Sequence, residues 1–116
     1  MELSKEQILS YLLDSLPYRV VFADTGHVIR YMNREAKYHY YQVRGYSNLI
    51  GRSIFECHSD KSKDALIAAV EKLKNHGNEI YLGVSVRNER KYINPVRNEK
   101  GELIGYFERF ELNQQK

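Results

Sequence analysis

The sequence predicts an α+β fold, in which helices from the middle of the chain cover one face of a five-stranded antiparallel sheet. Three observations support this prediction. Strand-like segments occur in neighbouring sets joined by short turns, which makes adjacent strands antiparallel. A helical region separates these sets, so it must cross over from the second strand to the third. Finally, the chain has 116 residues, which is enough for one domain with one core.

An amphipathic helix is predicted at the start of the chain, within residues 1–16. Ser4 can cap it, and Gln7 three residues later completes a capping box. Apolar residues recur at helical spacing on one face: Ile8, Leu9, Leu12, Leu13 and Leu16. A helix of this length is only marginally stable by itself. We therefore expect the apolar face to dock, either on its own domain or on a second copy of the chain.

A β-hairpin is predicted next, from residues 18–24 and 27–33. Both segments are rich in β-branched and aromatic residues. Thr-Gly supplies the turn between them, and Gly26 can take a positive φ. Residues 34–41 are consistent with one or two helical turns. Residues 49–56 predict a turn followed by a short helix.

A second long helix is predicted before Gly77, because glycine commonly stops a helix. Its buried stripe is expected to be Ala65, Leu66, Ala69, Val70 and Leu73. Three strands follow, at residues 79–87, 90–97 and 103–112. The first of them is expected to place Ile80, Leu82, Val84 and Val86 on one face. Pro95 cannot donate a backbone hydrogen bond, so it marks a sheet edge or a bulge.

The composition is that of a soluble domain, with 42% hydrophobic and 28% charged residues. The formal charge is +3, and basic and acidic residues alternate without a phosphate-binding stripe, so we expect no nucleic-acid partner. The single cysteine excludes an intramolecular disulfide. The chain carries neither a secretory signal pattern nor an apolar stretch of membrane-spanning length. We therefore expect a cytoplasmic protein without a membrane partner.

Three motifs resemble successive parts of the PAS domain. "FADTGHVIRYMNREA" is similar to the opening hairpin and first helix of that family, and "LIGRSIFECHSDKS" to the turn and short helix before its long helix. "NPVRNEKGELIGYFERFEL" is similar to its closing hairpin. The resemblance covers residues 17–112, preceded by the helix and followed by a frayed tail at 113–116. The "CH" pair with "KS" also resembles PAS domains attached to hemerythrin-like domains in bacteria and archaea.

The resemblance implies a sensory module. In this family the sheet and helices enclose a cavity, a ligand or cofactor alters the packing there, and the change passes to a partner signalling domain. PAS domains commonly dimerise through an N-terminal amphipathic helix, which agrees with the apolar face at the start of this chain. We therefore expect a homodimer. A PAS domain that binds nothing and acts as a scaffold for protein–protein interaction is an alternative.

The cofactor is not fixed by the sequence. A photoactive flavin needs a cysteine two residues after the Gly-Arg pair, and Ile54 occupies that position, so flavin is the less favoured option. A heme b sensor is a second alternative, in which His58 or the thiolate of Cys57 ligates the iron. The first interpretation of "FECHSDKS" is the lead-in to the long helix, and a ligand site is the second. Paired metal-ligand spacing for zinc is absent from the sequence.

A small organic ligand is the third option. Tyr31, Asn33 and Tyr41 are expected near the mouth of the cavity, with Ser85 and Asn94 on facing strands. Phenolic and amide groups in an apolar wall suit a modest polar metabolite. The residues predicted to contact a ligand or cofactor are therefore His58, Cys57, Tyr31, Asn33, Tyr41, Ile54, Ser85 and Asn94.

Catalysis is not expected. Cys57 and His58 are neighbours in sequence, and such neighbours seldom form a productive nucleophile–base pair. No third group that would orient the base is evident. The sequence predicts no catalytic residue and a protein that is not an enzyme.

Overall fold

The computed structural model describes residues 2–57, 60–75 and 77–113. Within them, one five-stranded antiparallel sheet has the strand order β2-β1-β5-β4-β3. The elements are α1 (Lys5–Asp14), β1 (Val20–Asp24), β2 (Ile29–Met32), α2 (Arg34–Lys37), the π-helix η1 (Tyr38–Val43), the 3₁₀ turn η2 (Ile54–Cys57), α3 (Asp60–Asn75), β3 (Ile80–Val84), β4 (Glu89–Arg97) and β5 (Leu103–Leu112). The predicted fold class is confirmed.

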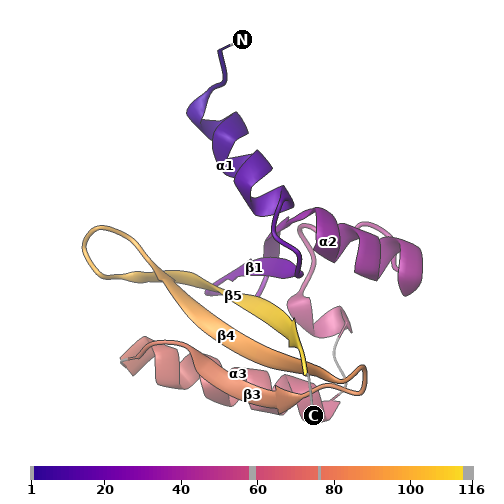
Figure 1. Cartoon of the computed structure of the whole chain (residues 1–116). Helices are drawn as coiled ribbons and strands as arrows, with labels where there is room; N and C mark the ends of the chain where they lie inside the picture. Colours follow the sequence, from indigo (N-terminus) through magenta and orange to yellow (C-terminus); the bar gives the residue numbers. More distant parts are fainter. Residues whose placement is uncertain (1, 58–59, 76, 114–116) are drawn as a thin grey trace.

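The helices of the crossover cover one face of the sheet, here called the inner face (Figure 1). α3 contacts β3, β4 and β5, whereas α2 contacts β1 and β2. The core lies between these layers and includes Val21, Ala23, Ile29, Met32, Leu66, Val70, Leu73, Ile93 and Tyr106. Four residues of the predicted α3 stripe are buried, but Ala65 is exposed. None of the described helices has the length and the apolar character needed to span a lipid bilayer.

α1 projects away from the body of the domain (Figure 1). The predicted capping box is present, because the Gln7 N–H donates to the Ser4 hydroxyl at 3.1 Å and the Ser4 N–H donates to the Gln7 side chain at 2.8 Å. No residue of α1 is buried. The start of this helix is therefore fixed by local hydrogen bonds and not by packing.

The turn between β1 and β2 differs from the prediction. The positive φ falls on His27, at 64°, and not on Gly26. The Asp24 carboxylate accepts the Gly26 N–H at 2.9 Å, and the Asp24 carbonyl accepts the His27 N–H at 2.9 Å. These bonds close a four-residue turn, so the left-handed residue comes one position later, as in hairpins that combine a turn with a bulge. The register of β2 against β1 shifts at this end.

β3 is shorter than predicted, because it ends at Val84 and residues 85–88 form the turn to β4. Gly83 takes a φ of 102°, and the register against β4 shifts at this residue. The resulting bulge ends the two-residue alternation on which the prediction of a single face depended. Val84 and Val86 are therefore exposed instead of continuing the face that begins at Ile80.

Two further predictions concern Pro95 in β4 and the tail that follows β5. Pro95 lies beyond the end of β3, which pairs with residues 90–93 of β4, so its missing N–H interrupts no hydrogen bond to β3. After β5, the Asn113 N–H donates to the Asn88 carbonyl at 3.1 Å. The predicted frayed tail at 113–116 thus begins with an anchored residue, and its remaining residues lie outside the described part.

Candidate functional site

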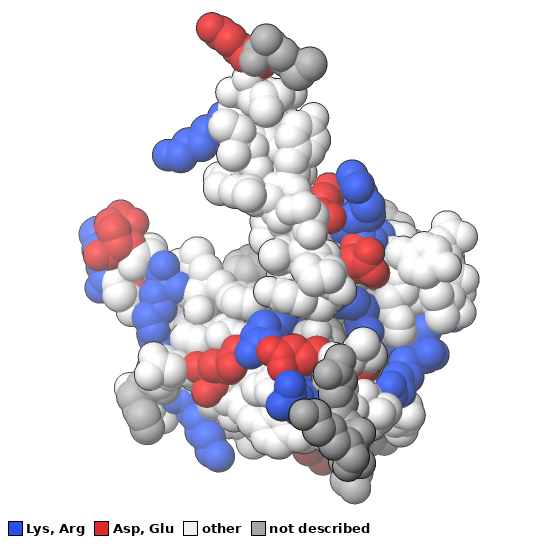
Figure 2. Space-filling model, in the orientation of Figure 1, with Lys and Arg blue, Asp and Glu red and all other residues white. Residues whose placement is uncertain are grey.

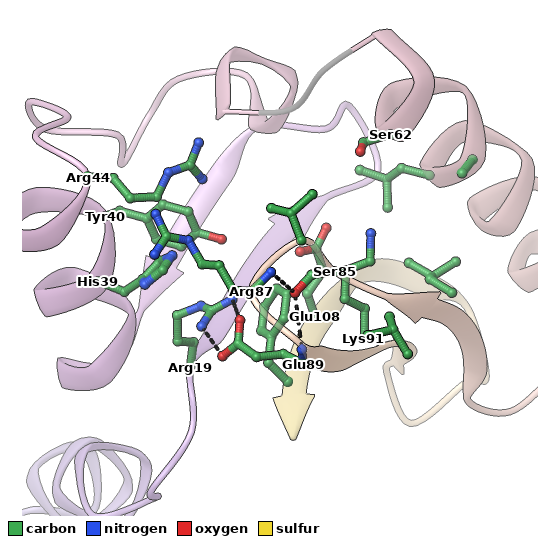
Figure 3. Close-up of a pocket in the computed structure, with 16 residues that line it drawn as sticks. Arg19, His39, Tyr40, Arg44, Ser62, Ser85, Arg87, Glu89, Lys91 and Glu108 are labelled. Atoms are coloured by element: carbon green, nitrogen blue, oxygen red, sulfur yellow. Dashed lines mark hydrogen bonds and ion pairs between the residues drawn. The ribbon is translucent and has the colours of Figure 1, made fainter. Parts of the chain in front are cut away.

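A cavity of about 540 Å³ opens on the inner face, between η1, α3 and the β3–β4 hairpin (Figure 3). Among the described residues, Ala65, Leu66, Leu82 and Phe110 form part of its apolar lining. The charged side chains that line the cavity, among the described residues, are those of Arg19, Arg44, Arg87, Lys91, Glu89 and Glu108. Both the volume and the combination of apolar walls with a few polar groups are typical of small-molecule sites.

Strand alternation places charged groups in this cavity. Glu89 and Lys91 lie two residues apart on β4, on the same face as the fully buried Ile93. Ile93 pairs with Glu108 of β5, and Lys91 pairs with Phe110. The inner face of the sheet therefore changes from an apolar core beside α3 to a mixed, charged surface at the hairpin end.

An ion pair between Arg19 and Glu89 forms the floor of the cavity. The guanidinium and the carboxylate make two parallel hydrogen bonds of 2.5 and 2.8 Å, and both side chains are largely buried. The guanidinium also stacks on the ring of Phe110, with its carbon 3.9 Å from the ring centroid. This arrangement attaches the segment just before β1 to the first residue of β4.

The same ion pair separates two cavities. A second cavity of about 590 Å³ is lined by Pro17 and Tyr18 from the α1–β1 connection, and it shares Arg19, Glu89 and Phe110 with the first cavity. A change in the ion pair would therefore alter the lining of both cavities. One of these cavities is lined by the connection to α1.

His39 lies in a positive environment at the edge of the first cavity. Burial, followed by the positive charges of Arg19 and Arg87, lowers its pKa from 6.5 to about 4. Arg44 acts in the same direction, and only Glu89 opposes the shift. His39 is therefore uncharged at neutral pH.

The stability of the folded chain is expected to decrease as the pH falls from about 6.5 to about 4, in part because of His39. Over this window the unfolded chain binds more protons at His39 than the folded chain, so its contribution to stability rises with pH and is lost on acidification. Chemical unfolding as a function of pH measures this, with His39→Gln as the comparison. The variant should lose less stability across the window. An NMR titration midpoint near 6.5 for His39 would contradict this.

Two of the predicted ligand residues lie on the opposite, outer face of the sheet. Tyr31 pairs with Phe22, outside the inward positions of β1 and β2, and hydrogen-bonds Ser10 of α1. Asn94 neighbours the buried Ile93 on β4, so alternation turns it outward, where it donates to Glu79 at 2.9 Å. The expected position of Tyr31 and Asn94 at the cavity is therefore wrong.

Asn33, Tyr41 and Ile54 are parts of the core and not of the cavity lining. Asn33 is fully buried and caps α2. The Tyr41 hydroxyl accepts the Leu49 N–H at 3.0 Å and donates to the sulfur of Met32 at 3.5 Å. Ile54 is almost completely buried. These residues position η1 and η2 around the cavity.

Ser85 lines the cavity, but from the β3–β4 turn and not from a strand. Its hydroxyl accepts the N–H groups of Arg87 and Glu89, both at 3.2 Å. Cys57 is the last residue of η2, and His58 lies outside the described residues. Ligation by Cys57 or His58 stays a prediction.

The charged lining was not found from the sequence. Arg19, Arg44 and Arg87 lie in three separate segments, before β1, after η1 and in the β3–β4 turn. Usable signals existed in β4, where Glu89 and Lys91 occupy the inward register of Ile93, and in β5, where Glu108 alternates with the buried Tyr106 and Phe110. Charged residues at inward strand positions indicate a polar cavity or an interface.

The described lining does not fit heme. A heme slot is largely apolar, with an axial ligand directed at the iron, whereas six charged side chains line this cavity in the described residues. Among these residues, α3 carries no histidine. No group of three or more His, Cys, Asp or Glu in the described part of the chain could hold a metal ion.

Solved structures share this fold. The C-terminal domain of a Streptococcus mutans protein is 22% identical with a TM-score of 0.72, covering 94% of this chain and 84% of its own. A PAS domain from Colwellia psychrerythraea is 14% identical with a TM-score of 0.69, covering 93% and 96%. A sensory box sensor histidine kinase from Vibrio cholerae is 19% identical with a TM-score of 0.58, covering 90% and 86%.

The sequence itself agrees with these structural similarities. No curated protein matches the chain significantly. The sequence profile of the PAS domain, however, matches residues 9–111, which is most of the chain and includes the whole sheet except the last residue of β5. This chain belongs to the PAS domain family.

Proposed function

We propose that this PAS domain is a cytoplasmic sensory module that takes up a small ligand in the 540 Å³ cavity and acts as a homodimer through α1. The observation that carries the proposal is the cavity itself, in which apolar walls and converging charged groups are held by a rigid sheet. The similar fold in a sensor histidine kinase supports a sensory role. The module signals by binding and not by catalysis.

The exposed face of α1 supports the homodimer. Ile8, Leu9 and Leu12 are 45%, 52% and 59% exposed, whereas Leu13 and Leu16 are half-buried next to their own domain. The surface of the projecting helix is mostly uncharged (Figure 2). A short helix of this kind needs a partner to bury its apolar side, and a second copy of α1 offers the same surface by symmetry.

A covalent and hydrogen-bonded path connects the cavity to α1. Arg19 in the cavity floor directly follows Tyr18, and the side-chain amide of Asn33 donates to the carbonyls of both Tyr18 and Leu13. A ligand that displaces Arg19 would therefore act on the segment that positions α1. This coupling is the physical basis of the proposed signal.

Sedimentation velocity at tens of micromolar should give a dimer for the chain and a monomer for Leu12→Glu. A charged side chain in the buried centre of the interface should weaken association by at least about tenfold. Ile67→Glu is the matched control, because Ile67 is an exposed apolar residue on α3. A monomer for the unchanged chain would contradict the dimer.

Ligand uptake is tested by the same chain in a thermal-unfolding screen against common metabolites. A binding compound should raise the melting temperature of the chain but not that of Ala65→Trp, in which an indole would fill the cavity mouth from the exposed side of α3. If no compound changes the melting temperature, the scaffold alternative is favoured over ligand sensing.

A further inference from the structure

The charges around the cavity are unbalanced. Its described lining carries four Lys and Arg side chains against two carboxylates, and Arg19 is already paired with Glu89. Neither Arg44 nor Arg87 forms an ion pair with a described residue, in contrast to most arginines of this chain. Two guanidinium groups thus line the cavity without forming an ion pair with a described carboxylate, although Glu89 and Glu108 line the same cavity.

Arg44 is held in place by aromatic rings. Its guanidinium carbon lies 5.6 Å from the ring centroid of Tyr40 and 5.0 Å from that of Tyr46, and it donates to the Tyr46 hydroxyl at 3.3 Å. Cation–π contacts of this kind favour a position beside the rings without neutralising the guanidinium. Arg44 is exposed, and these two rings are its contacts at the edge of the cavity.

Arg87 approaches from the other wall of the cavity. It belongs to the β3–β4 turn, where the Ser85 hydroxyl accepts its backbone N–H at 3.2 Å. The side chains of Arg44 and Arg87 converge on the side of the cavity where His39 and Tyr40 lie (Figure 3). Like charges gathered in this way are unfavourable unless an anion lies between them.

Part of the remaining cavity lining is apolar, although Lys91 and Glu108 also line it. Leu66 of α3 and Leu82 of β3 line it together with Phe110 of β5. A ligand that reaches this wall from the two arginines needs an apolar body attached to its anionic end. Inorganic phosphate has no such body, and a neutral molecule leaves the two positive charges uncompensated.

We infer that, if the proposed ligand-sensing function holds, the cavity takes a small organic carboxylate, whose carboxylate is bound by Arg44 and Arg87 and whose apolar body packs against Leu66, Leu82 and Phe110. Arginine forms paired hydrogen bonds to a carboxylate, which gives both arginines a partner in the bound state. The inference deepens the proposed function by naming the ligand class.

The test compares acids with their neutral amides by isothermal titration calorimetry on the full chain. The probes are acetate, butyrate, phenylacetate and indole-3-acetate, each with the corresponding amide, together with inorganic phosphate. At least one of the larger acids should bind at least about tenfold more tightly than its amide, because the charged hydrogen bonds are lost in the amide. Phosphate should not compete with it.

Arg87→Gln and Arg44→Gln should each weaken binding of that acid by about tenfold. Lys100→Gln is the matched control, because it removes one positive charge from the exposed β4–β5 loop, outside the cavity lining. Circular dichroism and thermal unfolding should be nearly unchanged in both arginine variants. Neither arginine forms an ion pair with a described residue, so neither substitution breaks one within the described part of the chain.

Three results would overturn the inference: no acid binds at millimolar concentration, an amide binds as tightly as its acid, or phosphate competes equally well. An amide that binds as tightly as its acid and loses binding in Ala65→Trp would remove the anion preference while leaving the proposed ligand sensing intact. The thermal-unfolding screen against metabolites tests separately whether the proposed ligand sensing itself is wrong.

Discussion

Asn33→Ala is expected to lower the free energy of unfolding by about 3 kcal/mol or more, because it removes a helix cap and leaves several buried polar groups unpaired. Asn33 is fully buried. Its side-chain oxygen accepts the N–H groups of Val20 and Ala36, both at 3.0 Å, and its amide donates to the carbonyls of Leu13 at 2.9 Å and Tyr18 at 3.0 Å. Urea denaturation at fixed protein concentration measures the loss.

Asn33→Asp separates the two halves of this network. A carboxylate keeps the acceptor for the two N–H groups but faces the carbonyls of Leu13 and Tyr18 without a donor. Its cost should therefore increase with pH, because burial next to two carbonyls disfavours the ionised form. Alanine should show no such additional pH dependence. A loss below about 1 kcal/mol for alanine would show that the network contributes little.

Arg19→Ala is expected to cost about 3 kcal/mol, because it leaves the carboxylate of Glu89 largely buried without its counterion. It also removes the guanidinium that stacks on Phe110. The separation between the two cavities depends on this pair, so the variant should also loosen the α1–β1 connection. Urea denaturation measures the first effect, and hydrogen exchange at the start of β1 measures the second.

A double-mutant cycle provides the control for this prediction. Arg19→Met with Glu89→Leu replaces the ion pair by two apolar side chains of similar length, and such replacements are often close to neutral in stability. The double variant should therefore be more stable than either single variant. Additive losses in the cycle would contradict an energetically coupled pair.

Local signals explain why much of the fold could be predicted. The α1 capping box, the hairpin turns and the stripe of α3 each depend on residues within a few positions of one another. The errors also have local causes. The positive φ lies at His27 and not at Gly26, and the bulge at Gly83 ends the two-residue alternation of β3. A bulge changes which side every later residue faces, so a small error in register becomes a large error in exposure.

The candidate site could be predicted only in outline. Ser85 lines the cavity from a turn and not from the predicted strand, whereas Tyr31 and Asn94 face outward. The cavity is instead defined by Arg19 and Glu89, which are 70 positions apart in the chain. Contacts at such separations leave no periodic pattern in a single sequence, because each partner is placed by a different element.

The sequence by itself determined the order of helices and strands, the antiparallel sheet and the apolar face of α1, since these follow from spacing and turn chemistry. Only the tertiary structure decided which charged residues meet. It paired Arg19 with Glu89 and placed Arg44 and Arg87 at the cavity without an ion pair to a described carboxylate. The physical reason is that secondary structure depends on neighbours along the chain, whereas the electrostatics of a cavity depend on neighbours in space.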